Sequence, residues 1–373
     1  MRFSTACVAG ALALSPLQAA AQSFKSSAGE LAVETVVGGL AHPWALAFLP
    51  DGNMLVTERP GRLRIATPAG KLTPALAGVP RVFASGQGGL HDVFVDRGFA
   101  ENRTIYFCYA EPTEGGARTA LARARLADER RLDQVHVIFR QEGPPSSGNH
   151  FGCRIAQTAD GNLFLTLGEH FSDRKEAQNL ANHLGKIVRI RPDGGVPPDN
   201  PFVGRAGAKP EIWSYGHRNP QGLALHPSSG KLWEHEHGPR GGDEVNIIEK
   251  GKNYGWPVIG YGIDYSGARI HEAASKPGME QPVKYWVPSI APSGMAFYRG
   301  DLFPAWRGNL LVGALAARLL VRLTLDGDKV VGEERLLDGL RERIRDVRVG
   351  PDGAIYLVTD NSAGRVLRVI PAK

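Results

Sequence analysis

The sequence is poor in cysteine, with three in 373 residues, which excludes a disulfide-stapled scaffold. It also lacks a C-x-x-C-H motif, which excludes covalently attached haem. Only 22% of its residues are charged and 42% are hydrophobic, a balance that excludes a disordered chain and permits a buried core. Basic residues exceed acidic ones by six but are scattered along the chain. Nucleic-acid binding is therefore not expected, and a small anionic ligand held by a few arginines fits better.

Long hydrophobic runs are also missing, apart from one near the start. Residues 6–17 are apolar, follow a positively charged start and precede a run of alanines, a pattern typical of a secretory signal peptide. The alternative, a short membrane anchor, is disfavoured because a span needs about 20 apolar residues. We therefore expect residues 1–22 to be a signal peptide and residues 23–373 to form a single mature domain without a membrane span, periplasmic or secreted. In that oxidising compartment Cys108 and Cys153 can pair, although their spacing alone does not establish it.

A turn followed by a short β-rich run recurs along the chain. Asp-Gly or Asn-containing turns, which supply the positive φ angles of tight strand connections, precede most of these runs. A second apolar run lies before the turn in each unit. The runs that follow the turns are residues 54–57, 104–107, 163–166, 232–233, 310–312 and 354–359. Six strand–turn–strand units without a long amphipathic helix between them predict an all-β fold, a six-bladed β-propeller, with a pair of β-sandwiches as the alternative.

Propeller geometry predicts which residues meet. If the first strand of each unit is innermost, the residues just before it lie at one end of the central channel. These positions are polar or basic in successive units: Gln87, His91, Asn149, His150, Arg218, Asn219, Ser293, Arg343 and Arg345. We expect them to converge on one mouth of the channel, where small-ligand sites are usually built.

Five motifs carry a resemblance to a known family. They are GNHFG at 148–152, WSYGHRNPQG at 213–222, EHGPRGGDE at 236–244, KNYGWP at 252–257 and RIRDV at 343–347. In this order they resemble the soluble pyrroloquinoline-quinone (PQQ) dependent sugar dehydrogenases, in particular the aldose sugar dehydrogenase branch, over about residues 36–369. The family fold is a six-bladed propeller, in agreement with the repeats. The resemblance implies oxidation of an aldose at its anomeric carbon to the lactone, with hydride passing to PQQ.

The resemblance assigns roles to individual residues. His150 is implied as the general base, since an imidazole titrates near neutrality, and Arg218 as the group that stabilises negative charge on the quinone oxygens. Guanidinium and amide groups suit a cofactor with three carboxylates. The implied cofactor-binding residues are Gln87, His150, Arg218, Asn219, Arg343 and Arg345, with Tyr265 as a weaker candidate. Trp286 is interpreted either as a ring on which a sugar stacks or as a core residue.

Calcium is implied twice by the same resemblance. Backbone carbonyls of Gly238 and Pro239 match a cofactor-site ion that polarises the quinone. Glu244 and the main chain of Tyr254 match a second, structural Ca²⁺. The stretch His-Glu-His at 235–237 invites a zinc interpretation, which we reject because it is not H-E-x-x-H and lacks a third ligand nearby.

The sequence departs from the family pattern in places and leaves other functions open. Ala316 and Ala317 directly follow Leu315, where the family often has a lysine, so one cofactor contact is missing or comes from Arg318. His91 stands where a leucine is more usual. The alternatives are a calcium-dependent lactone hydrolase and a non-enzymatic binding propeller. Without haem or iron–sulfur ligands of its own, a dehydrogenase of this kind needs a separate electron acceptor, a cytochrome or a quinone.

Overall fold

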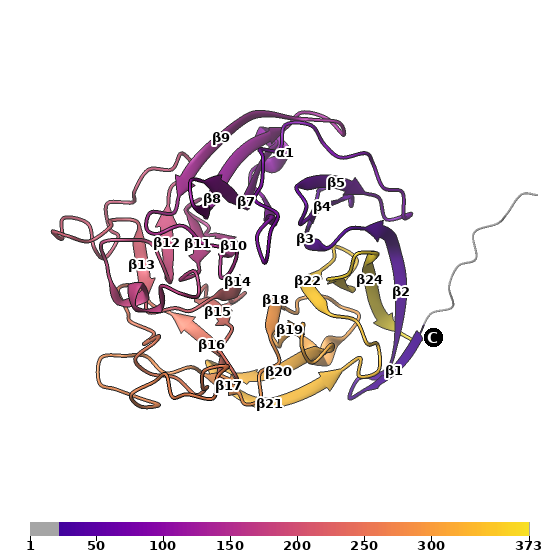
Figure 1. The fold of residues 1–373 in the computed structure, drawn as a ribbon. Coiled ribbons are helices and arrows are strands. Elements are labelled where there is room, and N and C mark those ends of the chain that lie inside the picture. The colour runs from indigo at the N-terminus through magenta and orange to yellow at the C-terminus, as the bar shows by residue number, and fades with distance from the viewer. Residues whose placement is uncertain (1–21, 373) are drawn as a thin grey trace, which may run out of the picture.

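Six antiparallel β-sheets surround a common axis in the computed structural model, which describes residues 22–372 (Figure 1). The predicted all-β, six-bladed β-propeller is thereby confirmed. The predicted signal peptide lies almost entirely outside the described residues and stays a prediction. The first three blades are β3 (Pro43–Phe48), β4 (Met54–Glu58) and β5 (Arg62–Ala66); β6 (Leu90–Val95), β7 (Thr104–Thr113), β8 (Gly116–Leu126) and β9 (Leu132–Arg140); and β10 (Gly152–Gln157), β11 (Leu163–Leu167), β12 (Lys186–Ile190) and β13 (Ile212–Tyr215).

The last blade joins the two ends of the described chain. Strand β2, drawn in indigo, lies beside β24, drawn in yellow, and pairs with it antiparallel (Figure 1). This pairing closes the ring with main-chain hydrogen bonds between segments that are far apart in the sequence. The remaining blades are β14 (Pro220–Leu225), β15 (Leu232–Glu236), β16 (Asp243–Ile248) and β17 (Lys284–Trp286); β18 (Pro292–Phe297), β19 (Leu310–Ala314), β20 (Leu320–Asp326) and β21 (Lys329–Leu336); and β22 (Ile344–Val349), β23 (Ile355–Thr359) and β24 (Gly364–Pro371) with β2 (Gly29–Leu40) and β1 (Gln22–Ser26).

Helical structure is limited to three short segments among residues 22–372. They are α1 (Phe99–Asn102) and two 3-10 helices, η1 (Arg174–Gln178) and η2 (Pro304–Trp306). The turn expected at residues 101–103 is instead the end of α1 and its left-handed cap at Arg103. No helix in this part of the chain has the length and apolar character that a membrane span requires.

The first strand of each blade is the innermost, as expected. Strands β3, β6, β10, β14, β18 and β22 contact one another in turn around the axis. In all six, the pairing with the second strand shifts register near the start of the first strand. Such bulges turn side chains away from the regular alternation and are common beside binding sites. Because the second strand runs back, its last residues lie at the same end of the ring as these bulges.

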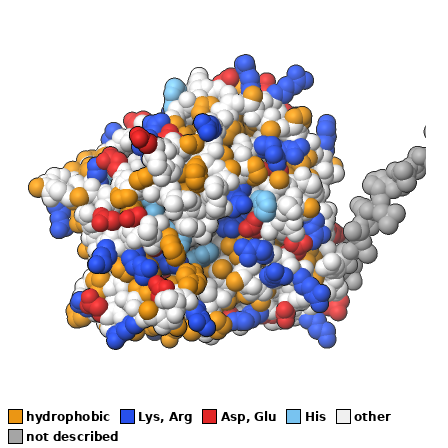
Figure 2. All heavy atoms as spheres, viewed as in Figure 1, with side chains coloured by type: hydrophobic (Ala, Val, Ile, Leu, Met, Phe, Trp, Pro, Cys, Tyr) orange, Lys and Arg blue, Asp and Glu red, His pale blue; other side chains and the backbone are white. Residues whose placement is uncertain are grey.

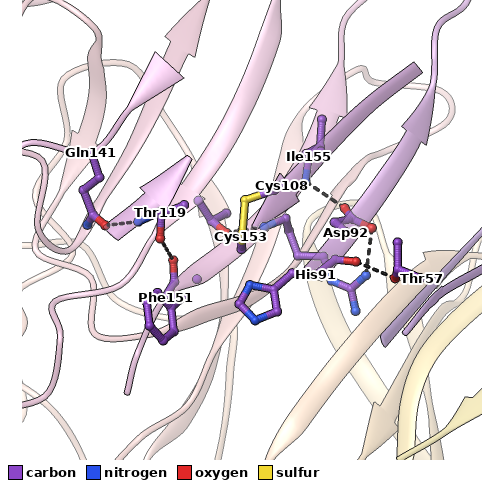
Figure 3. Close-up of a disulfide and its surroundings, with 12 residues drawn as sticks. Thr57, His91, Asp92, Cys108, Thr119, Gln141, Phe151, Cys153 and Ile155 are labelled. Carbon is purple, nitrogen blue, oxygen red and sulfur yellow. Dashed lines mark hydrogen bonds and ion pairs between the residues drawn. A yellow bond between two sulfur atoms is a disulfide. The ribbon is translucent and has the colours of Figure 1, made fainter. Parts of the chain in front are cut away.

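Apolar clusters between neighbouring blades form the core, and a disulfide crosses one of them. Cys108 on β7 and Cys153 on β10 are joined, with their Cα atoms 5.7 Å apart (Figure 3). Both lie fully buried in the cluster between blades two and three. The pairing that the sequence left open is therefore present, and it fixes the start of β10 just after residues 148–152.

A buried ion-pair network links three innermost strands. Arg154 on β10 contacts Asp92 on β6 at 3.1 Å and Asp346 on β22 at 3.0 Å. Arg348 contacts the same two aspartates at 2.8 and 2.9 Å. The Arg154 side chain is only 3% exposed, so removing either partner would leave an uncompensated buried charge.

Candidate functional site

A cavity of about 200 Å³ lies where the innermost strands begin. Residues of all six blades contribute to it, which places it on the ring axis. On the face drawn in Figure 2, histidine and basic side chains are visible near the centre of the ring. The residues that line the cavity are Trp44, Arg59, Gln87, His91, Phe151, Gly152, Asn219, Gln221, His237, Ala291, Leu315, Arg343, Arg345 and Asp360.

Two of the predicted arginines converge on one carboxylate of the cavity wall. Arg345 Nη2 donates to Asp360 Oδ2 at 2.9 Å, and Arg343 Nη2 lies 3.8 Å from the same oxygen. Burial acts to raise the pKa of Asp360, but Arg345, His42 and Arg343 outweigh it and hold this pKa well below its usual range. Among residues 22–372, no group accepts a hydrogen bond from the buried Nε of Arg345. One aspartate thus offsets two guanidinium groups, and the cavity keeps an excess of positive charge.

Amide side chains connect the blades around the cavity. Oε1 of Gln87 accepts the backbone N–H of His150 at 2.9 Å, and Oδ1 of Asn219 accepts that of Gly152 at 3.2 Å. Below them, Arg154 donates to the backbone carbonyls of Gln221 at 2.7 Å and Arg345 at 3.2 Å. The ion-pair network therefore supports the cavity floor.

His91 lies directly under Gln87. Its Nε2 lies 3.0 Å from the Gln87 carbonyl, and its ring packs between Trp44 and Phe151 at centroid distances of 5.0 and 5.7 Å. Complete burial lowers the pKa of His91 to about 3. This histidine is neutral at ordinary pH and packs beneath Gln87 in the cavity wall.

His150 forms a buried pair with Glu169, a residue that the sequence analysis did not single out. Nδ1 of His150 lies 3.2 Å from Oε1 of Glu169, and the two side chains are 6% and 1% exposed. The backbone of His150 is left-handed, with φ of 51°. Among residues 22–372 no group hydrogen-bonds Nε2 of His150, and that nitrogen is left to act on a ligand.

Burial and neighbouring cations set the charge of this pair. Burial lowers the pKa of His150 well below its usual range, and Arg218, His170 and Arg174 lower it further. Burial also raises the pKa of Glu169 to about 7, while Arg218 acts in the opposite direction. Above that pH a neutral imidazole donates Nδ1–H to a carboxylate, which fixes the tautomer in which Nε2 is the basic nitrogen.

Arg218 lies beside this pair in the next blade. Its backbone carbonyl accepts the N–H of Glu169 at 3.0 Å, which connects it to the His150 pair. Its Nη1 donates to the carbonyls of Gly238 at 2.8 Å and His237 at 3.1 Å, and its Nε is buried without a partner. The guanidinium, 5.3 Å from the Trp256 ring centroid, is thus held through Nη1, while neither Nε nor Nη2 hydrogen-bonds another group among the described residues.

The four predicted metal ligands lie together next to Arg218. Gly238, Pro239, Glu244 and Tyr254 all line one recess of about 20 Å³, together with Glu236. A space of this size holds a single ion or water molecule. The Gly238 carbonyl already accepts Arg218, so a cation at that oxygen would share it with a guanidinium.

A buried acidic cluster, Glu234, Glu236 and Glu244, extends from this recess along β15 and β16. Glu236 and Glu244 are direct cross-strand partners. Burial and the neighbouring carboxylates raise the pKa of Glu234 and of Glu244 well above the usual range. His217, Glu234 and Glu236 bring ligand atoms within 4.8 Å of one another. Three carboxylates at this depth fit a bound cation, which would offset their repulsion.

Other expected residues lie elsewhere. Tyr265 is 59% exposed and lines a small recess above Arg218 rather than the large cavity. Trp286 is 4% exposed in the core between blades four and five, which matches the core interpretation and excludes a platform for sugar. Arg318 does not line the cavity; among the described residues, Arg59 supplies the additional guanidinium there.

The residues missed by sequence reasoning share one topological position. Glu58, Glu169, Glu236 and Asp360 stand at the end of the second strand of their blades or up to two residues beyond it. Three of them contact a mouth residue: Glu236, for example, accepts the backbone N–H of Asn219 at 3.3 Å, whereas Glu58 accepts that of Ala41. An acidic residue at or just after the end of the second strand in four blades is a signal that the sequence carried, because the ends of the second strands meet the starts of the first.

Comparison with known proteins places the chain in a family. Residues 40–368 match the family described as Glucose / Sorbosone dehydrogenase. Aldose sugar dehydrogenase YliI of Escherichia coli (strain K12) is 47% identical over 363 residues, 96% of this chain and 98% of that protein. Among solved structures, a glucose dehydrogenase is 55% identical with a TM-score of 0.89, over 91% of this chain and 99% of that one. The PQQ-bound form of an aldose sugar dehydrogenase from Streptomyces coelicolor is 30% identical with a TM-score of 0.76, over 91% and 98%.

These matches extend over nearly all of the described propeller and confirm the resemblance carried by the five motifs. The chain belongs to the glucose/sorbosone dehydrogenase family.

Proposed function

We propose that this protein is a PQQ-dependent dehydrogenase that oxidises aldoses at the anomeric carbon to the lactone. The observation that carries the proposal is the buried His150–Glu169 pair beside Arg218, at the edge of an arginine-lined cavity. The relatives named above, among them a PQQ-bound aldose sugar dehydrogenase, support the cofactor and the substrate class. Family membership disfavours the lactone hydrolase and the binding propeller.

The residues of the cavity fit a cofactor with three carboxylates. Arg59, Arg343 and Arg345 surround it. The buried Nε of Arg345 has no hydrogen-bond partner among the described residues and can donate to a cofactor carboxylate. Gln87 and Asn219 add amide donors, and a planar guanidinium can bind both oxygens of one carboxylate. Bound PQQ would supply the acceptor for the hydride that leaves the anomeric carbon.

His150 is the proposed general base, because it is a buried neutral imidazole beside Arg218 whose Nδ1 is held by Glu169 and whose Nε2 is free among the described residues. It takes the proton of the anomeric hydroxyl at that nitrogen, and the ionised Glu169 stabilises the imidazolium through Nδ1–H. Arg218 presents positive charge where negative charge develops on the acceptor, and its fixed position avoids reorganisation.

Calcium is the cation we propose for the recess beside Arg218. Glu244 and the main chain of Tyr254, with Glu236 in the same recess, supply the oxygen ligands that this ion prefers. Gly238 and Pro239 would hold a cation on the cofactor side, where it would act as a Lewis acid. Electrons would leave through a separate cytochrome or quinone, in the periplasm or outside the cell if residues 1–22 act as a signal peptide.

The test is reconstitution of the purified apo-protein with PQQ and Ca²⁺, followed by aldose-dependent reduction of a redox dye. We expect activity that is lost in His150→Ala and kept in the matched control His136→Ala, an exposed histidine on the outer strand β9. Dye reduction that survives His150→Ala would remove this residue from the mechanism. Absence of reduction with every aldose would overturn the proposed function.

A further inference from the structure

Two consecutive residues after Glu169 adopt a backbone conformation that side chains rarely take. His170 and Phe171 have φ of 64° and 69°. Left-handed geometry at two adjacent non-glycine residues is unfavourable and persists only where the surroundings impose it. Here they do: both ring nitrogens of buried His170 face acceptors, Pro144 O at 2.8 Å and Gln141 Oε1 at 2.9 Å. The turn after Glu169 is therefore enforced.

The enforced turn places the ring of Phe171 beside the proposed base. Phe171 meets His150 edge to face, with a centroid distance of 5.2 Å and an interplanar angle of 82°. Its ring is nevertheless 40% exposed, and the ring of Tyr265 beside it is 59% exposed. A patch of exposed aromatic surface next to a reactive group indicates a contact with a ligand.

A second segment also contacts this ring. Tyr265 stacks on Phe171 with a centroid distance of 6.4 Å and an interplanar angle of 30°. One residue before Tyr265, Asp264 accepts a hydrogen bond from Arg174 of η1 at 3.2 Å. The stack and the ion pair both join the segment after β11 to the long connection between β16 and β17, and a rigid wall results.

The recess bounded by this wall encloses only about 10 Å³, so a sugar would lie across its open side; the residues that line it have the chemistry of a sugar site. Phe171 and Tyr265 supply aromatic surface, while Glu169, Arg174, Arg218 and Asp264 supply charged donors and acceptors. A pyranose has one comparatively flat face of C–H groups, which packs on an aromatic ring, and a rim of hydroxyls, which need hydrogen-bond partners.

We propose that Phe171 is the platform on which the pyranose ring of the aldose stacks, held in place by Tyr265 and the Arg174–Asp264 ion pair. The proposal rests on the proposed function, since it assigns the substrate contact of the same site. Phe171 thereby aligns the anomeric hydroxyl with His150 and contributes to the choice among aldoses.

The experiment measures kcat and KM separately for the PQQ- and Ca²⁺-loaded enzyme. In Phe171→Leu we expect KM for the aldose to rise about 3- to 10-fold, the loss of one stacking contact, while the PQQ concentration for half-maximal activity stays unchanged. Phe171→Tyr keeps the aromatic face and should restore KM to near the wild-type value. Tyr285→Leu is the matched control, an exposed ring that stacks on Tyr261 outside this recess, and should leave KM unchanged.

The outcomes separate the two proposals. Wild-type KM in Phe171→Leu, or a lower kcat with unchanged KM in both Phe171 variants, would overturn the platform and leave the proposed function in place. Wild-type protein that oxidises no aldose would overturn the proposed function and this inference together. If Phe171→Leu melts well below the wild type, the comparison is made with Phe171→Tyr and Asp264→Asn instead. Asp264→Asn keeps the Phe171 ring but should raise KM, because it loosens the wall. An unchanged KM in Asp264→Asn would then contradict the proposal.

Discussion

Breaking the disulfide between Cys108 and Cys153 should destabilise the fold strongly. The bond joins residues 45 positions apart, and in the chain-entropy description a loop of that length restricts the unfolded chain by about 4 kcal/mol at 25 °C. Either single substitution breaks the bond. We therefore expect Cys108→Ala and Cys153→Ala each to lower the free energy of unfolding by about 4 kcal/mol, and the double variant to lose only slightly more.

Equilibrium unfolding in guanidinium chloride, followed by tryptophan fluorescence, measures these losses. Wild-type protein refolded and kept under reductant is the matched control, because it lacks the bond but keeps both sulfur atoms in the cluster between the blades. Its loss isolates the cross-link from the packing of the side chains. Losses below about 1 kcal/mol, or single losses that simply add in the double variant, would refute the reasoning.

Three other predictions follow from buried charges. The value of kcat/KM should fall below about pH 7, because burial raises the pKa of Glu169 to about 7 and only its ionised form accepts Nδ1–H of His150. This acid limb of the pH profile should disappear in Glu169→Gln, and its persistence there would contradict the assignment. Arg154→Met should lower the free energy of unfolding by about 3–5 kcal/mol, since it leaves two buried aspartates to share one cation, Arg348. Arg189→Met, whose acidic partners are exposed, should cost about 1 kcal/mol or less; equal losses in denaturant titrations would argue against this. A chelator should lower the melting temperature by on the order of 5 °C, because the buried acidic cluster loses its cation. The chelator should lower the melting temperature of Glu244→Gln by less, and a wild-type melting temperature that the chelator leaves unchanged would exclude a structural ion.

The blades were predictable because their signal is local. Turns such as those at 51–53 and 352–353 precede β4 and β23 directly, and a strand–turn–strand unit can be recognised without knowing its neighbours. The closure of the ring was not predictable in the same way. Strand β2 finds its partner β24 more than 300 residues later, and no local pattern encodes that pairing.

The site was predictable in part for a related reason. Residues at the start of the first strands follow from the repeat register, and the structure brings Gln87, Asn219, Arg343 and Arg345 to one cavity. Their roles, and that of His150, stay predictions. Glu169 was missed because the repeat register points only to the residues just before each first strand. The second strand runs back to the same end of the ring, and Glu169, which follows the second strand of its blade, reaches the same site. Arg59 was missed likewise: it follows β4 directly, and its approach to the cavity depends on the three-dimensional ring.

The mixed origin of the last blade has a consequence for biosynthesis. Five blades can be complete on a growing polypeptide while β2 still has its hydrogen-bonding edge vacant, since its neighbour is among the final residues to be made. The unpaired edge of this twelve-residue strand can form main-chain hydrogen bonds with other nascent chains, which leads to aggregation. A short peptide copying β24 should compete for that edge and trap the polypeptide as an open arc.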